Sequence, residues 1–214
     1  PMDTLFRGDR LPPDQIPLLQ GRKTVLFAPT WNRSMSALGV IGRRVVKLLL
    51  GASEDINLSI KPHPATLRDQ GDWMAELRRA AQGRKNIWLV EDPANDGMAL
   101  LPLADVLVSD ASSVIFAFLA CDRPLVLITH PQRKQDPGYD EHGIEWRWRD
   151  VGQQVFDIET LPAAIRRALE QPQLRAAERA RYRHLLFGEY TDGHAAERIA
   201  TRISALPRPP STPA

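Results

Sequence analysis

The chain of 214 residues lacks several features that would assign a protein class at once. It has a single cysteine, Cys121, which excludes an internal disulfide framework and a cysteine-based zinc site and is typical of a reducing compartment. Its apolar runs are short, and none approaches the ~20 residues needed to span a bilayer. The opening residues, Pro1 to Leu5, lack the basic-then-apolar pattern of a signal peptide. We therefore expect a cytoplasmic protein.

The chain also has little net charge. Its 28 basic and 26 acidic residues leave +2 at pH 7, which argues against a nucleic-acid partner. The composition, 43% hydrophobic and 25% charged, is ordinary for a globular protein. The length favours one domain.

Familiar catalytic and cofactor motifs are missing as well. Without Gly-x-Gly-x-x-Gly or Gly-Lys-Ser/Thr, dinucleotide and P-loop sites are disfavoured. Without Gly-x-Ser-x-Gly, an α/β-hydrolase is disfavoured too. His142, His184 and His194 do not have the spacing of metal ligands. We expect neither a metal nor a cofactor.

The two ends of the chain differ from its middle. Prolines 12, 13 and 17 stand among polar residues, which predicts that residues 1–22 form a leader or linker outside the core. The proline-rich residues 206–214 are expected to be a disordered tail. Because the first residue is Pro1, we expect the chain to have been cut from a longer protein.

Between the ends, short apolar runs alternate with amphipathic stretches. Strands are predicted at 24–28, 56–60, 86–90, 105–109, 124–128 and, more weakly, 154–157. Helices are predicted near 37–51, 71–83, 96–104, 112–121, 160–170, 173–187 and 193–205. Apolar runs without polar alternation are typical of strands buried on both faces. The alternation predicts an α/β fold with a doubly wound parallel sheet.

Polar residues follow most of the predicted strands. Ligands of an open parallel sheet bind beyond the carboxyl ends of its strands, near the switch in strand order. The candidates for binding a ligand at this edge are Thr30, Asn32, His63, Glu91, Asp96, Asp110, Ser112 and Ser113. Glu91 and Asp96 could instead only end a strand and cap a helix.

The serine pair Ser112–Ser113 precedes a nearly continuous apolar helix at 114–120. One serine is expected to cap the helix. The other hydroxyl and the unpaired N–H groups of the first turn would suit a phosphate. A routine helix cap with no ligand is the alternative.

His63 lies between Pro62 and Pro64 in a stiff, non-helical turn. Such a turn would fix the imidazole at the sheet edge, where it could donate to a phosphate oxygen or protonate a leaving phosphate. Alternatively, the ring packs against the prolines and bonds a carbonyl group.

Two other segments combine charged and aromatic residues. Trp146 and Trp148 alternate with Arg147 and Arg149 in an amphipathic patch. The arginine-rich segment 166–183 could meet an anionic surface, but a solvated helical face is the favoured interpretation.

Four motifs occur in a characteristic order. They are Leu26-Phe-Ala-Pro-Thr-Trp31, Lys61-Pro-His-Pro64, Ala104-Asp-Val-Leu-Val-Ser-Asp-Ala-Ser-Ser-Val114 and Asp192-Gly-His-Ala-Ala-Glu-Arg-Ile199. Together they resemble the carboxyl-terminal half of the CDP-glycerol:poly(glycerol phosphate) glycerophosphotransferases, which extend teichoic acid and related capsule polymers. The resemblance covers roughly residues 23–205.

This resemblance implies a fold and a set of roles. Residues 23–205 would be the Rossmann-like, donor-nucleotide half of a GT-B transferase, and the acceptor half would precede Pro1. By position, Ser112 and Ser113 would hold the donor phosphates, and His63 would act in catalysis beside the pyrophosphate. Asp192 and Gly193 would close onto the nucleotide. Asp110 matches the family's usual aspartate, although Ala111 replaces the common tyrosine.

The resemblance also implies an activity and partners. Glycerol phosphate, or a sugar, would pass from a CDP-activated or other nucleotide-activated donor to a polymer or lipid-linked acceptor. The enzyme would then lie at the inner face of the cell membrane. Residues 136–143 depart from the family pattern, which leaves the transferred group open. A UDP-N-acetylglucosamine 2-epimerase-like enzyme and a non-catalytic nucleotide-binding module are the alternatives.

Overall fold

The computed structural model describes residues 2–9, 11–53, 55–92 and 97–206. Its centre is a six-stranded sheet in which every pairing is parallel, in the order β3-β2-β1-β4-β5-β6. The strands are β1 (Lys23–Phe27), β2 (Ile56–Ile60), β3 (Ile87–Leu89), β4 (Val106–Ser109), β5 (Leu125–Ile128) and β6 (Gln153–Val155). The predicted fold class and all six predicted strands are confirmed.

The strand order reverses between β1 and β4. Phe27, near the carboxyl end of β1, pairs with Ile60 of β2 on one side and with Val108 of β4 on the other. Strands β2, β4 and β5 are buried throughout, as their apolar runs predicted. The loops after β1, β2 and β4 therefore meet at the switch point of the sheet.

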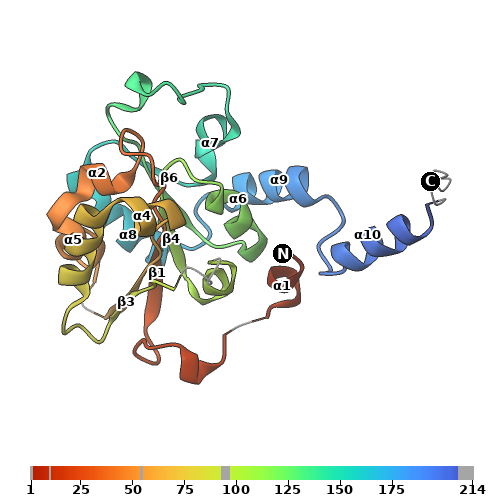
Figure 1. Ribbon diagram of the computed structural model, residues 1–214, viewed down its shortest axis with the longest axis horizontal. Helices are drawn as coiled ribbons and strands as arrows, with labels where there is room; N and C mark the ends of the chain where they lie inside the picture. Colours follow the sequence, from red (N-terminus) through yellow and green to blue (C-terminus); the bar gives the residue numbers. More distant parts are fainter. Residues whose placement is uncertain (1, 10, 54, 93–96, 207–214) are drawn as a thin grey trace, which may run out of the picture.

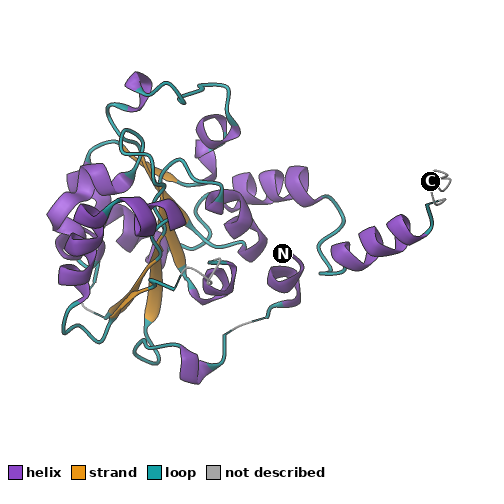
Figure 2. Cartoon of the chain, viewed as in Figure 1, coloured by secondary structure: helices purple, strands orange, loops and turns teal. Residues whose placement is uncertain are grey.

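Helices cover both faces of the sheet (Figures 1 and 2). One face packs against α2 (Ala37–Ile41), α3 (Val45–Leu49), α5 (Gly71–Ala81) and α8 (Leu161–Glu170). The other packs against α1 (Met2–Arg7), α6 (Val114–Phe118), α9 (Ala176–Phe187) and the 3-10 helix at Met98–Leu103. The remaining helices are α4 (Pro64–Asp69), α7 (Ile144–Arg147) and α10 (Ala195–Ser204), and α10 extends away from the body.

Two of the predicted helices differ in form. The stretch predicted at 37–51 breaks at Gly42, whose φ of 53° ends α2 before α3 begins. In the stretch predicted at 96–104, the structure has a 3-10 helix at Met98–Leu103 that contains Pro102. Among the described residues, no helix combines the length and apolar character that a bilayer crossing requires.

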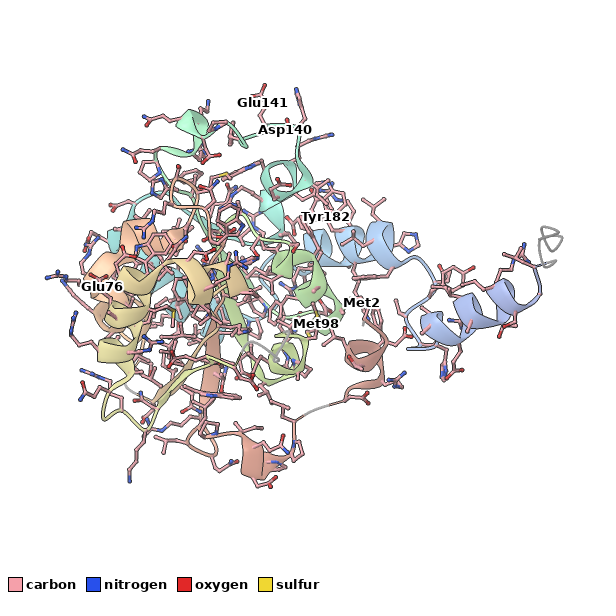
Figure 3. All side chains as sticks on the ribbon, in the orientation of Figure 1. Met2, Glu76, Met98, Asp140, Glu141 and Tyr182 are labelled. Atoms are coloured by element: carbon pink, nitrogen blue, oxygen red, sulfur yellow. The ribbon has the colours of Figure 1, made fainter. Side chains whose placement is uncertain are left out.

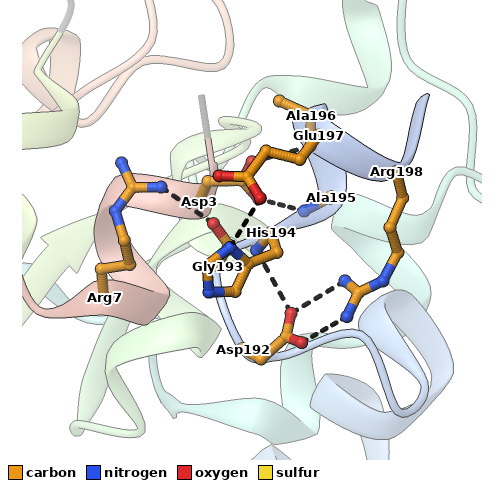
Figure 4. Close-up of polar contacts among 9 residues, drawn as sticks. All are labelled: Asp3, Arg7, Asp192, Gly193, His194, Ala195, Ala196, Glu197 and Arg198. Atoms are coloured by element: carbon orange, nitrogen blue, oxygen red, sulfur yellow. Dashed lines mark hydrogen bonds and ion pairs between the residues drawn. The ribbon is translucent and has the colours of Figure 1, made fainter. Parts of the chain in front are cut away.

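Helix α1 was not predicted, and it packs onto the core. Leu5 is buried with the apolar residues of α6 and of the 3-10 helix before β4, so residues 1–22 do not all lie outside the core. The Asp3 carboxylate accepts hydrogen bonds from the amides of Ala195 (3.1 Å) and Ala196 (2.8 Å) at the start of α10. Arg7 Nη1 donates to the carbonyl of Gly193 at 2.8 Å. Figure 4 shows these contacts, which tie the two ends of the fold together.

Replacing Asp3 by alanine should loosen the first turn of α10. The amides of Ala195 and Ala196 lose their acceptors, so their hydrogen exchange should become roughly fivefold faster, as for a lost N-cap. Exchange measured residue by residue by NMR checks this. Asp9→Ala is the matched control. Asp9 is exposed, and its carboxylate accepts a hydrogen bond from Arg7 Nη2 at 3.2 Å rather than from the amides of α10. Equal acceleration in both variants would contradict the capping role.

Candidate functional site

A cavity of about 290 Å³ opens at the carboxyl edge of the sheet, where β1, β2 and β4 end. Its polar side chains come from two loops: Lys61 and His63 follow β2, and Ser112 and Ser113 follow β4. Its apolar lining consists of Leu26, Ala28, Pro29, Pro62, Pro64, Gly97, Met98, Leu101 and Val114. The structure thus brings His63 together with the serine pair at the switch point, where the sequence places a ligand site.

His63 is held by the helix that it caps. It occupies the N-cap of α4, Pro64 follows at the first helical position, and His63 Nδ1 accepts a hydrogen bond from the amide of Ala65 at 3.1 Å. Because Nδ1 accepts, the neutral ring carries its proton on Nε2. His63 therefore offers Nε2–H as a fixed donor.

The surroundings of His63 keep the ring neutral. Burial lowers the pKa of His63, and the positive charges of Lys61 and Arg68 lower it further. Protonation of Nδ1 would also break the bond from Ala65. Of the two chemical roles open to His63, this arrangement favours hydrogen-bond donation over proton transfer.

The serine pair does not cap its helix. Ser113 occupies the N-cap position of α6 with no side-chain capping bond, so the expected serine cap is wrong. At the start of α6, the amide of Ile115 donates a hydrogen bond to the backbone carbonyl of Ser112 at 3.2 Å. Among the described residues, this is the first backbone hydrogen bond of the turn. Both serines line the cavity, so their hydroxyls can bind a ligand there.

Lys61 is a cavity residue that sequence reasoning did not single out. Its side chain is only 8% exposed and lies along Gly97, where an added Cβ would be 3.7 Å from Lys61 Cε. A buried ammonium group in a cavity with hydroxyl donors favours an anionic ligand. The sequence feature that could have identified Lys61 is its position directly after β2, two residues before His63.

Asp110, Thr30 and Asn32 serve the framework behind the cavity. The buried Asp110 carboxylate accepts from the amide of Thr30 (2.9 and 3.1 Å to its two oxygens) and from that of Ala37 (2.6 Å). Asn32 Oδ1 accepts from the amide of Ser34 at 3.0 Å and shapes the same loop. These bonds fix the loop after β1 to the end of β4. None of the three residues lines the cavity.

Burial raises the pKa of Asp110 to about 6, although hydrogen bonds from Ala37, Thr30 and Ala111 and the charge of Arg149 oppose the shift. Arg149 bonds the backbone of Asp110 rather than its carboxylate: Nη1 donates to Asp110 O at 2.9 Å. A titratable carboxyl group is thus buried behind the residues that line the cavity.

The other predicted site residues lie elsewhere. Glu91 forms an ion pair with Arg78 (2.6 Å between Oε1 and Nη2) and lines a different cavity. Asp192 pairs with Arg198, which holds the pKa of Asp192 well below its usual range, and Gly193 packs against α1 (Figure 4). Asp96 falls outside the described residues. No group of three or more metal-ligating side chains occurs in the part of the chain that the structure covers.

Solved structures that superpose on this chain include a polymerase and a glycosyltransferase. The wall teichoic acid polymerase TagF superposes with a TM-score of 0.66 at 20% identity, over 95% of this chain and 50% of that chain. A TagF structure soaked with CDPG gives 0.65 at 20% identity, over 95% and 47%. The glycosyltransferase SnogD from Streptomyces nogalater gives 0.51 at 18% identity, over 89% and 46%. At these identities the likeness shows the fold alone, that of about half of each of these structures.

The chain spans about half the length of these structures. No curated protein sequence matched it. A family profile, described as CDP-Glycerol:Poly(glycerophosphate) glycerophosphotransferase, matches residues 3–205, nearly the whole chain and more than the four motifs alone. The chain therefore belongs to the CDP-glycerol:poly(glycerophosphate) glycerophosphotransferase family.

Proposed function

We propose that this chain is the donor-binding half of a transferase that moves glycerol phosphate from CDP-glycerol to a growing cell-surface polymer. The observation that carries the proposal is the convergence of Lys61, His63, Ser112 and Ser113 on one cavity at the switch point. One positive charge, a fixed N–H donor and two hydroxyls suit the diphosphate of a nucleotide donor.

The proposed reaction is displacement at phosphorus. An acceptor hydroxyl attacks the phosphorus that bears glycerol, the bond from that phosphorus to the bridging oxygen breaks, and CMP leaves with the bridging oxygen. Negative charge grows on the leaving phosphate. His63 Nε2–H and the serine hydroxyls stabilise this charge because they are already in place before the reaction. The proton of the acceptor hydroxyl goes to a base supplied by the acceptor half.

The partners follow from the same proposal. The acceptor is a polymer, free or lipid-linked, and the acceptor half is a second α/β domain that this chain does not contain. A lipid-linked acceptor would place the enzyme peripherally at the inner face of the membrane.

Calorimetric titration of the chain with CMP, CDP, UMP and UDP tests the donor. We expect CDP to bind more tightly than CMP, because the second phosphate gains contacts with Lys61 and His63. Cytidine nucleotides should bind more tightly than uridine nucleotides. Binding of UDP with none of CDP would favour a sugar transferase or a UDP-N-acetylglucosamine 2-epimerase-like enzyme. If none of the four nucleotides binds, the proposed donor-binding function is contradicted.

A further inference from the structure

A second cluster of charged side chains lies after β5, on the segment that leads to β6. It comprises Arg133, Tyr139, Trp146 and Arg149, called here the arginine–aromatic cluster. Arg133 Cζ lies 6.0 Å from the ring centre of Tyr139 and 5.7 Å from that of Trp146. Arg149 Cζ lies 5.2 Å from the same indole ring, and the two aromatic ring centres are 5.1 Å apart. Two guanidinium groups thus share one indole ring.

Among the described residues, no carboxylate neutralises these two cations by direct contact. Neither Arg133 nor Arg149 forms an ion pair within the described ranges. Arg149 is only 5% exposed: its Nη2 donates to Ile128 O and Thr129 Oγ1, both at 3.0 Å, whereas its buried Nε has no partner. Burial and the charge of Arg133 lower the pKa of Arg149 to about 10, and only the buried Asp110 opposes them.

The acidic residues of this segment have other contacts or are exposed. Asp150 pairs with Arg181 (2.9 Å), and the Glu145 carboxylate lies against Gly143. Asp140 and Glu141 are exposed and lie at the outer margin of the loop (Figure 3). Asp136 Oδ1 accepts from the amide of Gly138 at 2.8 Å. Two like charges held close together are unfavourable unless an anion joins them. The aromatic rings stabilise the cations in this arrangement through cation–π contacts.

Arg149 links the arginine–aromatic cluster to the loop that carries the serine pair. Arg149 Nη1 donates to Asp110 O, and Asp110 precedes Ser112 by two residues. The loop after β5 begins at the same carboxyl edge of the sheet as the loops that form the cavity. An anion at the cluster would thus be a neighbour of a donor bound at Ser112 and Ser113.

We propose that the arginine–aromatic cluster is a second phosphate-binding site, which takes the phosphate of a glycerol phosphate unit. Guanidinium groups bind phosphate oxygens through paired N–H donors, and the part-exposed Arg133 offers the accessible one. The unit comes either from the transferred end of the donor or from the growing end of the acceptor. That choice rests on the proposed function, whereas binding of the anion does not.

Calorimetric titration of the chain with glycerol 3-phosphate tests the site. We expect binding that Arg133→Gln weakens by at least about tenfold, the usual effect of losing a charged hydrogen-bond donor. Lys134→Gln removes the same charge from the exposed neighbouring position and should change the affinity less than twofold. Equal affinities for the wild-type chain and Arg133→Gln, or no binding of glycerol 3-phosphate to the wild-type chain, would overturn the proposal.

Competition between CDP-glycerol and glycerol 3-phosphate shows whether the site takes the phosphate of the donor or that of the acceptor. If CDP-glycerol displaces glycerol 3-phosphate and Arg133→Gln weakens CDP-glycerol but not CMP, the site takes the donor's outer phosphate. If glycerol 3-phosphate binds equally well to the chain saturated with CDP-glycerol, the site takes the acceptor's phosphate. Arg133-dependent binding of glycerol 3-phosphate without any nucleotide binding would support this site while contradicting the proposed function.

Discussion

Replacing His63 by alanine should lower the turnover of the complete transferase by about 100-fold or more. A donor aimed at the charge that develops in the transition state typically contributes ~3 kcal/mol to lowering the barrier. The Nε2–H of His63 is such a donor, because the amide of Ala65 fixes the ring and its tautomer. Ser113→Ala should produce a loss of the same order. Steady-state turnover with CDP-glycerol and a polymer acceptor measures both.

Matched controls separate this role from a general effect of mutation. His184 and Ser204 are exposed and neither lines the cavity, so His184→Ala and Ser204→Ala should leave turnover within about twofold. Near-native turnover of His63→Ala and Ser113→Ala would remove both residues from the mechanism. Because the pKa of His63 is lowered, turnover should also show no loss from His63 titration between pH 7 and pH 8.

Asp110 should give the protein an unusual dependence of stability on pH. Its pKa is about 6 in the folded chain and 3.8 in the reference state, so the folded state binds the proton more tightly. The contribution of Asp110 to the free energy of unfolding is therefore fully present below pH 3.8. It is lost as the pH rises through about 6. A difference of roughly two pKa units corresponds to about 3 kcal/mol.

Denaturant unfolding of the wild-type chain and Asp110→Asn measures this contribution. The wild-type chain should gain most of this, about 2.4 kcal/mol, relative to Asp110→Asn between pH 7 and pH 4. Asp136→Asn is a control of opposite sign, because a backbone hydrogen bond from Gly138 lowers the pKa of Asp136. That variant should instead gain on the wild-type chain as the pH falls. A constant difference between wild type and Asp110→Asn would show that Asp110 titrates normally in the folded chain.

The sheet could be predicted from sequence because its strands are buried on both faces. A run such as Val106–Ser109 does not alternate apolar with polar residues. Its short length and the polar residues that flank it identify it as a strand. The site edge followed from the sheet, since parallel strands end at one edge. The same reasoning predicts His63 and the serine pair at this edge, and the structure places them around one cavity.

The remaining roles depend on partners that are distant in sequence. Asp110 accepts from Thr30 and Ala37, which are 80 and 73 residues away, and no local pattern reveals such bonds. Asp3 caps a helix that begins 192 residues later. The serine cap was predicted wrongly because a local rule, Ser before a helix, ignored the cavity that the same hydroxyls line. Local propensity thus located the elements, whereas tertiary contacts assigned the polar side chains.

The most direct test of the account is a crystal structure of the chain soaked with CDP. The account predicts phosphate oxygens within hydrogen-bond distance of His63 Nε2 and of the hydroxyls of Ser112 and Ser113. A diphosphate bound elsewhere on the chain, with this cavity filled by solvent alone, would contradict it.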